Sequence, residues 1–188
     1  RDRPAELGRT LRAIEALGGH ELVGGAEVVI ADNDSVEPVR VPERLSSGVA
    51  VRVIRRAKNE GAAARNACVA ACSPGSAWIV MLDDDSYPLH GGLMEAIKSA
   101  GSDVAAIAGE IFLPSAVGVR HEAGGLPEVF VGCGVAIRRG VYESLGGYDA
   151  AFDYYAEEYD LSARMILAGW RVVFDRRVAV MHEKVSAW

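Results

Sequence analysis

Short apolar runs alternate with helix-like stretches along this chain, and several of the runs end in acidic residues. The clearest run is Trp78–Leu82, which continues directly into the carboxylates Asp83, Asp84 and Asp85. A continuous apolar run of this length predicts a strand that is buried on both faces. The three acids therefore fall just past the carboxyl end of a strand, at the edge where open α/β sheets bind ligands.

The same pattern predicts the other elements of an α/β fold. Helices are expected over residues 1–18, from about 61 to 72, and over 91–100, 141–145 and 156–168. Strands are expected over residues 26–31, 51–54, 78–82, 103–108, 129–137, 171–174 and 178–180, with an irregular stretch over 109–127. Alternating strands and helices predict a mostly parallel central sheet with right-handed crossovers. Because the chain opens with a helix, we expect that a first strand is missing before residue 1.

Length and composition are those of one globular domain, with 188 residues, 50% hydrophobic and 24% charged. The net charge of −6 gives no support for a nucleic-acid partner. No apolar run approaches the ~20 residues of a transmembrane helix, although peripheral membrane contact stays open. The three cysteines, Cys68, Cys72 and Cys133, form no paired CxxC motif, which favours a reducing cytoplasm. Cys68 and Cys72 share a helix face, where packing is favoured over a metal or redox role.

Two groups of acids follow predicted strands. Three adjacent carboxylates repel one another, and a divalent cation such as Mg²⁺ or Mn²⁺ is the simplest compensation; a solvated acidic turn is the alternative. Asp32 and Asp34 also follow a strand, so they should share the same edge of the sheet. There they would accept hydrogen bonds from a base or ribose, or close an Asx-turn.

A further acidic group opens a predicted helix. The helix dipole and an i,i+4 pair with Arg164 explain Asp160, but they leave Glu157 and Glu158 unexplained. One of these glutamates could serve as a general base if it faces the ligand site.

Two basic side chains have open roles. Arg65, on the alanine-rich helix, either reaches a diphosphate or is a surface arginine. His182, at the end of a predicted strand, either ligates a metal or is structural.

Taken together and in order, these segments resemble the family-two glycosyltransferases of the GT-A fold, over essentially the whole chain. The resemblance rests on residues 2–7, 28–35, 59–66, 82–85, 132–139, 146–152, 157–161 and 180–182. In it, Asp83 and Asp85 are the defining acids of a DxD motif, with Asp85 holding the metal and Asp83 holding the ribose or metal. The nucleotide-sugar-binding set that it implies is Asp32, Asp34, Asn59, Gly61, Arg65, Asp83 and Asp84.

The resemblance also implies the remaining roles. Glu158 is the expected catalytic base, with Glu157 as the alternative because a glutamate stands where the family has aspartate. His182 matches the histidine at the end of the family's terminal strand, and we expect it to add a metal ligand. A Q-x-x-R-W motif is absent from this sequence, which favours transfer of a single sugar.

The expected protein is therefore an inverting, hexosyltransferase-like enzyme that depends on Mn²⁺ or Mg²⁺. It would move one sugar from a UDP-, dTDP- or GDP-type donor to an acceptor hydroxyl. We expect one domain over residues 1–188, with a donor-binding half over 1–108 and an acceptor-side half over 109–188. One alternative is a catalytically silent or truncated nucleotide-binding or interaction domain. Another is an aspartyl-phosphate phosphatase, although that class has Thr or Val where this chain has Tyr87.

Overall fold

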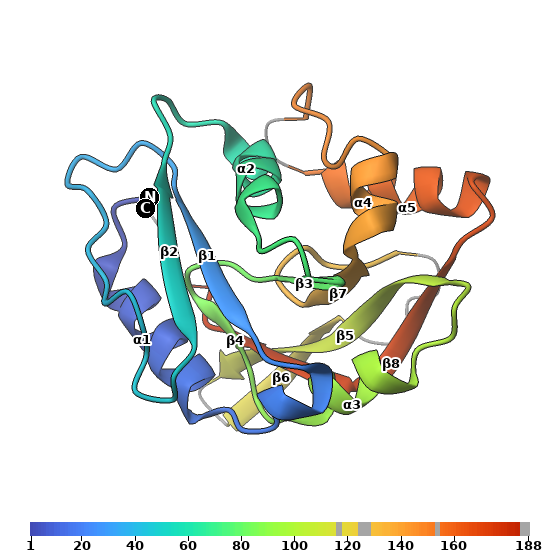
Figure 1. Ribbon diagram of the computed structural model, residues 1–188, viewed down its shortest axis with the longest axis horizontal. Coiled ribbons are helices and arrows are strands. Elements are labelled where there is room, and N and C mark those ends of the chain that lie inside the picture. Colours follow the sequence, from blue (N-terminus) through green and yellow to red (C-terminus); the bar gives the residue numbers. More distant parts are fainter. Residues whose placement is uncertain (116–117, 124–128, 153–154, 185–188) are drawn as a thin grey trace.

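The computed structural model describes residues 1–115, 118–123, 129–152 and 155–184, arranged as two sheets with helices around them (Figure 1). In the smaller sheet, β1 (Glu27–Asp32) pairs in parallel with β2 (Ala50–Arg55). The larger sheet has six strands in the order β3-β7-β5-β8-β4, with β6 paired to β5. Its strands are β3 Trp78–Met81, β4 Ser86–Pro88, β5 Val104–Ser115, β6 Gly118–Ala123, β7 Val135–Arg138 and β8 Arg171–His182.

The helices cover both faces of the larger sheet. They are α1 Pro4–Ala16, α2 Ala64–Ala71, α3 Gly92–Ser99, α4 Arg139–Ser144 and α5 Glu157–Leu167, with short 3₁₀ helices η1 His20–Val23 and η2 Gly61–Ala63. On one face, α2, α4 and α5 bury apolar side chains against β3, β5 and β7. On the other, α3 packs Leu93 and Met94 against β5, β7 and β8. The predicted helices are all present, with ends within a few residues of those expected.

The expected α/β class is confirmed, but the larger sheet is mixed rather than parallel. Among its described strands, only β5 and β8 run parallel, while β3/β7, β5/β7, β5/β6 and β4/β8 are antiparallel. Parallel neighbours need a crossover of a dozen or more residues, usually a helix. Between β5 and β7 the described chain forms the strand β6 instead, so β7 returns antiparallel.

Three predicted segments were wrong in their extent. Residues 109–127 were expected to be irregular, but within the described part β5 continues to Ser115 and pairs with β6. The strand expected over 129–137 covers only Val135–Arg138, because the Gly134 N–H donates to the Val131 carbonyl at 3.1 Å and closes a turn. The two strands expected at 171–174 and 178–180 form one strand, β8, with a shift in its register against β5.

Gly109 explains why β5 is longer than expected. A Cβ at this position would lie 2.6 Å from the Val178 carbonyl oxygen and 2.9 Å from that of Gly134. The glycine therefore allows a close approach of backbones in mid-strand and does not end the strand.

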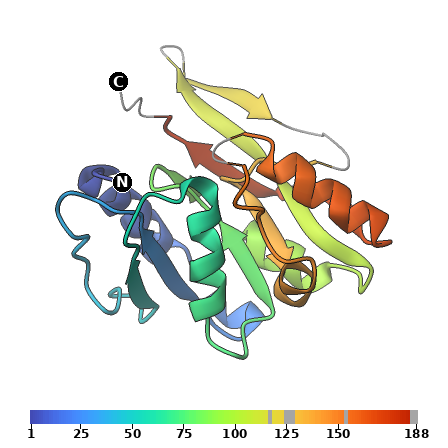
Figure 2. The ribbon, with the colours of Figure 1, turned by 90° about the horizontal axis from the view of Figure 1, so that it is seen from above.

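A cleft of about 1490 Å³ separates the two sheets. In the described part of the chain β1 pairs only with β2, and the edge of β3 that faces β1 has no strand beside it. Apolar side chains of α1 and α2 line the cleft together with both strands, and α2 lies over β1 and β3 (Figure 2).

None of the described helices is both long and apolar enough to cross a membrane.

Candidate functional site

The acidic triplet forms a tight turn between β3 and β4. Ser86 closes this turn, because its hydroxyl accepts the Asp83 N–H at 2.7 Å and its own N–H donates to the Asp83 carbonyl at 3.2 Å. Ser86 is fully buried. Each of the three carboxylates forms an ion pair with an arginine, so the triplet is not a solvated acidic turn.

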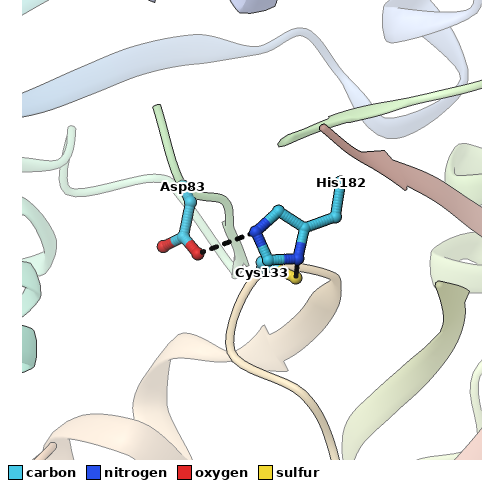
Figure 3. Close-up of side chains that lie close together, drawn as sticks. All are labelled: Asp83, Cys133 and His182. Atoms are coloured by element: carbon cyan, nitrogen blue, oxygen red, sulfur yellow. Dashed lines mark hydrogen bonds and ion pairs between the residues drawn. The ribbon is translucent and has the colours of Figure 1, made fainter. Parts of the chain in front are cut away.

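The end of β8 lies beside this turn. His182 pairs in register with Ser86, which places the imidazole next to the acids. Its Nε2 lies 3.6 Å from Oδ1 of Asp85 and 4.0 Å from Oδ2 of Asp83. Its Nδ1 lies 3.5 Å from the Sγ of Cys133 (Figure 3).

Two arginines offset the charge of the triplet. Arg3, at the start of α1, donates from Nη1 to Oδ1 of Asp84 at 2.8 Å and from Nη2 to Oδ2 of Asp85 at 2.5 Å. Arg65, on α2, forms an ion pair with Oδ1 of Asp83. Arg65 is therefore part of the site and not a surface arginine.

The carboxylate oxygens that face His182 fit a divalent cation together with its Nε2. The arginines bind Oδ2 of Asp85 and Oδ1 of Asp83, whereas the other oxygen of each carboxylate faces Nε2 of His182 at 3.6 and 4.0 Å. Ligands about 2.1 Å from an octahedral cation lie about 3 Å apart when adjacent and about 4 Å apart when opposite. The two carboxylate oxygens suit Mn²⁺ or Mg²⁺, and the imidazole adds a nitrogen donor beside them. The structure thus brings together the three side chains predicted to bind metal.

The two glutamates at the start of α5 have different surroundings. Oε1 of Glu158 accepts the Gly132 N–H at 3.1 Å, and a Cβ on Gly132 would lie 2.8 Å from that oxygen. Glu157 is only 6% exposed, and its Oε2 has no hydrogen-bond partner among the described residues. Burial raises the pKa of Glu157, and the neighbouring Glu158 raises it further. Both glutamates interact electrostatically with Arg65, as Asp83 does, so α5 begins at the same site.

Asp32 is buried, and both oxygens of its carboxylate accept hydrogen bonds. Oδ1 accepts the Ser35 N–H at 3.1 Å, and Oδ2 accepts the Val39 N–H at 3.1 Å and Nη1 of Arg55 at 2.6 Å. Burial raises the pKa of Asp32, but these hydrogen bonds outweigh it and lower the pKa to about 2. The geometry favours the turn-closing alternative for Asp32 over contact with a base or ribose.

We expect Asp32→Asn to lower the free energy of unfolding at pH 7 by about 2 kcal/mol, because the folded state lowers the pKa of Asp32 from 3.8 to about 2. A lowered pKa contributes stability that is complete above the unfolded pKa and is lost as pH falls through the folded pKa. Denaturant unfolding should therefore show a difference between wild type and variant that shrinks between about pH 4 and pH 2. Asp34→Asn is the control, because the Asp34 side chain is 42% exposed. A difference that does not change with pH would contradict the role of the charge.

The loops after β1 and β2 are joined at the same edge. Oδ1 of Asn59 accepts Nδ2 of Asn33 at 2.7 Å and the Gly61 N–H at 3.1 Å. Gly61 has a φ of 56°, which glycine adopts without strain. Asp34 also has a positive φ, and it lies 3.7 Å from Arg1 in an exposed ion pair. Of the predicted site residues, those lining the cleft are Gly61, Arg65, Asp83, Asp84, Asp85 and His182.

Sequence reasoning missed three contributors to this site. Arg3 contacts acids more than 80 positions away along the chain, and no local signal marks it. The sequence pattern gives Cys133 no role of its own, and the glycine on each side of it is the one signal of a close approach. The Gly132 N–H that orients Glu158 is a backbone donor, which a residue pattern does not reveal.

Comparison with known proteins gives one family and one fold. The family model described as "Glycosyl transferase family 2" matches residues 2–121. Among the curated proteins, none matches this sequence.

Solved structures share the fold at low sequence identity. The mannosyltransferase PcManGT from Pyrobaculum calidifontis, in complex with GDP-Man and Mn²⁺, has a TM-score of 0.73 and 17% identity over 98% of this chain and 54% of its own. GalNAc-T7 with UDP, GalNAc and Mn²⁺ has a TM-score of 0.70 and 17% identity, over 95% of this chain and 41% of its own. Residues 1–349 of S. aureus TarS have a TM-score of 0.73 and 13% identity, over 97% of this chain and 58% of theirs. The chain spans about half the length of these proteins.

Proposed function

Because this chain belongs to glycosyl transferase family 2, whose model matches residues 2–121, we propose that it transfers one sugar from a nucleoside-diphosphate donor to an acceptor hydroxyl. The observation that carries the proposal is the convergence of Asp83, Asp85 and His182 in the lining of the cleft, with one oxygen of each carboxylate 3.6 to 4.0 Å from Nε2 of His182. PcManGT and GalNAc-T7 hold Mn²⁺ together with nucleotide or nucleotide-sugar ligands, which supports the same kind of ligand here. Family membership also argues against the aspartyl-phosphate phosphatase alternative.

Asp85, Asp83 and His182 would hold Mn²⁺ or Mg²⁺. The cation, when bound, supplies positive charge to the diphosphate leaving group. Arg65 lies against Asp83 and adds a fixed positive charge on the α2 side of the site. Asp84 and the Asn59–Gly61 loop would contact the nucleotide, together with Asp34, at the carboxyl ends of the strands.

Glu158 would act as the general base. It takes the proton from the acceptor hydroxyl while that oxygen bonds to the anomeric carbon and the bond from that carbon to the diphosphate oxygen breaks. The attack comes from the face opposite the leaving group, so the configuration inverts. The Gly132 N–H holds one carboxylate oxygen of Glu158, which leaves the other for the proton. Glu157 is the alternative base, since burial raises its pKa.

This assignment divides the chain into a donor-binding half over residues 1–108 and an acceptor-side half over 109–188. Glu158 and Cys133 come from the second half, and the acidic triplet comes from the first. The cytoplasmic location and the hydroxyl nature of the acceptor stay predictions.

Thermal unfolding with Mn²⁺ or Mg²⁺ and with UDP, dTDP, GDP, ADP or CDP tests the proposal. A nucleotide at ~100 times its dissociation constant should stabilise the fold by about 2.7 kcal/mol. We expect a shift that needs the cation and is largest for one base. No shift with any nucleotide would contradict the proposal, whereas a shift without sugar transfer from any matching donor would favour the catalytically silent alternative.

A further inference from the structure

A thiol lies among the predicted metal ligands, and the proposed function gives it no role. Cys133 is 2% exposed, and its Sγ lies 3.5 Å from Nδ1 of His182. One ligand atom from each of Asp83, Cys133 and His182 lies within 4.8 Å of the others (Figure 3). The loop before β7 holds the thiol in place, because Cys133 packs with Ile111 of β5 and Val180 of β8.

The ligand atoms of Asp83, Cys133 and His182 suit a softer cation than the Mn²⁺ or Mg²⁺ that would bind the nucleotide sugar. A thiolate, an imidazole and a carboxylate are typical ligands of Zn²⁺, whereas Mg²⁺ and Mn²⁺ prefer oxygen. Ligands on tetrahedral zinc, at about 2.3 Å for sulfur and about 2.1 Å for nitrogen, lie about 3.5 Å apart. The Sγ–Nδ1 distance of 3.5 Å already has this value.

We propose that Cys133, His182 and Asp83 form a site for a thiophilic divalent cation such as Zn²⁺, and that this cation excludes the one that binds the donor. Binding breaks the S–H bond of Cys133, releases one proton to solvent and leaves the thiolate on the metal, with no change of oxidation state. The claim that this cation excludes Mn²⁺ or Mg²⁺ rests on the proposed function, whereas the claim that it binds to Cys133, His182 and Asp83 does not.

The chemistry of imidazole makes the two cations compete. A neutral imidazole has one nitrogen with a lone pair and one that carries a proton. The Mn²⁺ or Mg²⁺ that binds the nucleotide sugar would use Nε2, which faces Asp85 and Asp83. The thiophilic cation would use Nδ1, which faces Cys133. With metal on Nδ1, the Nε2–H points toward Oδ1 of Asp85, 3.6 Å away, as metal-bound histidines commonly point toward a carboxylate. Asp83 belongs to both sets of ligands, so only one cation binds at a time.

Titration with Co²⁺ tests the site without any measurement of activity. Cobalt bound to a thiolate gives a sulfur-to-metal charge-transfer band in the near ultraviolet. We expect this band in the wild type and in the Cys68→Ser and Cys72→Ser controls, its loss in Cys133→Ser and Cys133→Ala, and its displacement by Zn²⁺. Circular dichroism and thermal unfolding check that the variants fold, and His182→Asn provides a second variant that should also lose the band. A band that is absent from the wild type, or that persists without Cys133, overturns the site.

A second experiment tests whether the thiophilic cation excludes Mn²⁺. It measures the Mn²⁺-dependent rise in unfolding temperature with the nucleotide that binds, in the presence and absence of Zn²⁺. Zn²⁺ should abolish this shift in the wild type, and Cys133→Ser should need at least about 10-fold more Zn²⁺ for the same effect. A shift that Zn²⁺ supports as well as Mn²⁺ does would overturn the exclusion. A cobalt band in a protein without any nucleotide shift would leave the thiophilic site standing and contradict the proposed function instead.

Discussion

Replacing Glu158 by glutamine is expected to lower turnover by about 10²–10⁴-fold, because an amide cannot take the proton of the acceptor hydroxyl. The amide oxygen can still accept the Gly132 N–H, so the side chain should keep its position. We therefore expect the thermal shift with Mn²⁺ and nucleotide to stay at the wild-type size. Release of the nucleoside diphosphate in the presence of acceptor measures the turnover.

Glu157→Gln is the matched control, since it makes the same change one residue earlier on α5. Glu157 is buried and its pKa is raised, so a neutral amide there should cost little stability. If Glu157→Gln loses turnover and Glu158→Gln does not, the roles of the two glutamates are exchanged. Near-normal turnover in both variants would mean that neither is the base.

Replacing Asp85 by asparagine is expected to weaken Mn²⁺-dependent nucleotide binding by at least about 100-fold, because the charged ligand nearest to His182 is lost. The thermal shift with Mn²⁺ and nucleotide should then disappear at concentrations that saturate the wild type. Asp85 is 3% exposed and binds Arg3, so the variant should also be less stable without ligand, and each shift must be compared with the variant's own unfolding temperature.

Asp84→Asn is the control that distinguishes the loss of a metal ligand from the loss of one negative charge in the turn. Asp84 and Asp85 both form an ion pair with Arg3, whereas Asp85 is the one whose other oxygen faces Nε2 of His182. The Asp84 variant should therefore keep a metal-dependent shift, even if nucleotide binding weakens. Equal loss of Mn²⁺ dependence in both variants would contradict the assignment of Asp85 as the metal ligand.

Local pattern was enough to predict the elements and the place of the acids. The apolar run that ends at Leu82 predicted a strand with carboxylates at its carboxyl end, and β3 with the turn at Asp83 has that arrangement. Burial on both faces and helical periodicity are short-range properties, so the residues on each side of an element carry them. The same reasoning could not decide the fate of Asp32, because closing a turn and binding a ribose require the same carboxylate.

By itself, the sequence determined the α/β class, the family, the positions of the helices and the place of the acidic triplet just after β3. It did not show that Asp32 and Asp34 follow a strand of a separate, smaller sheet. Only the tertiary structure decided that the larger sheet is mixed, that β5 passes through Gly109, that Arg3 offsets the acidic triplet, and that Cys133 lies against His182. Strand order, ion pairs and metal geometry depend on contacts between residues far apart along the chain, 82 positions for Arg3 and Asp85 and 49 positions for Cys133 and His182. Such contacts form only when the whole chain has packed, so no local window of the sequence contains them.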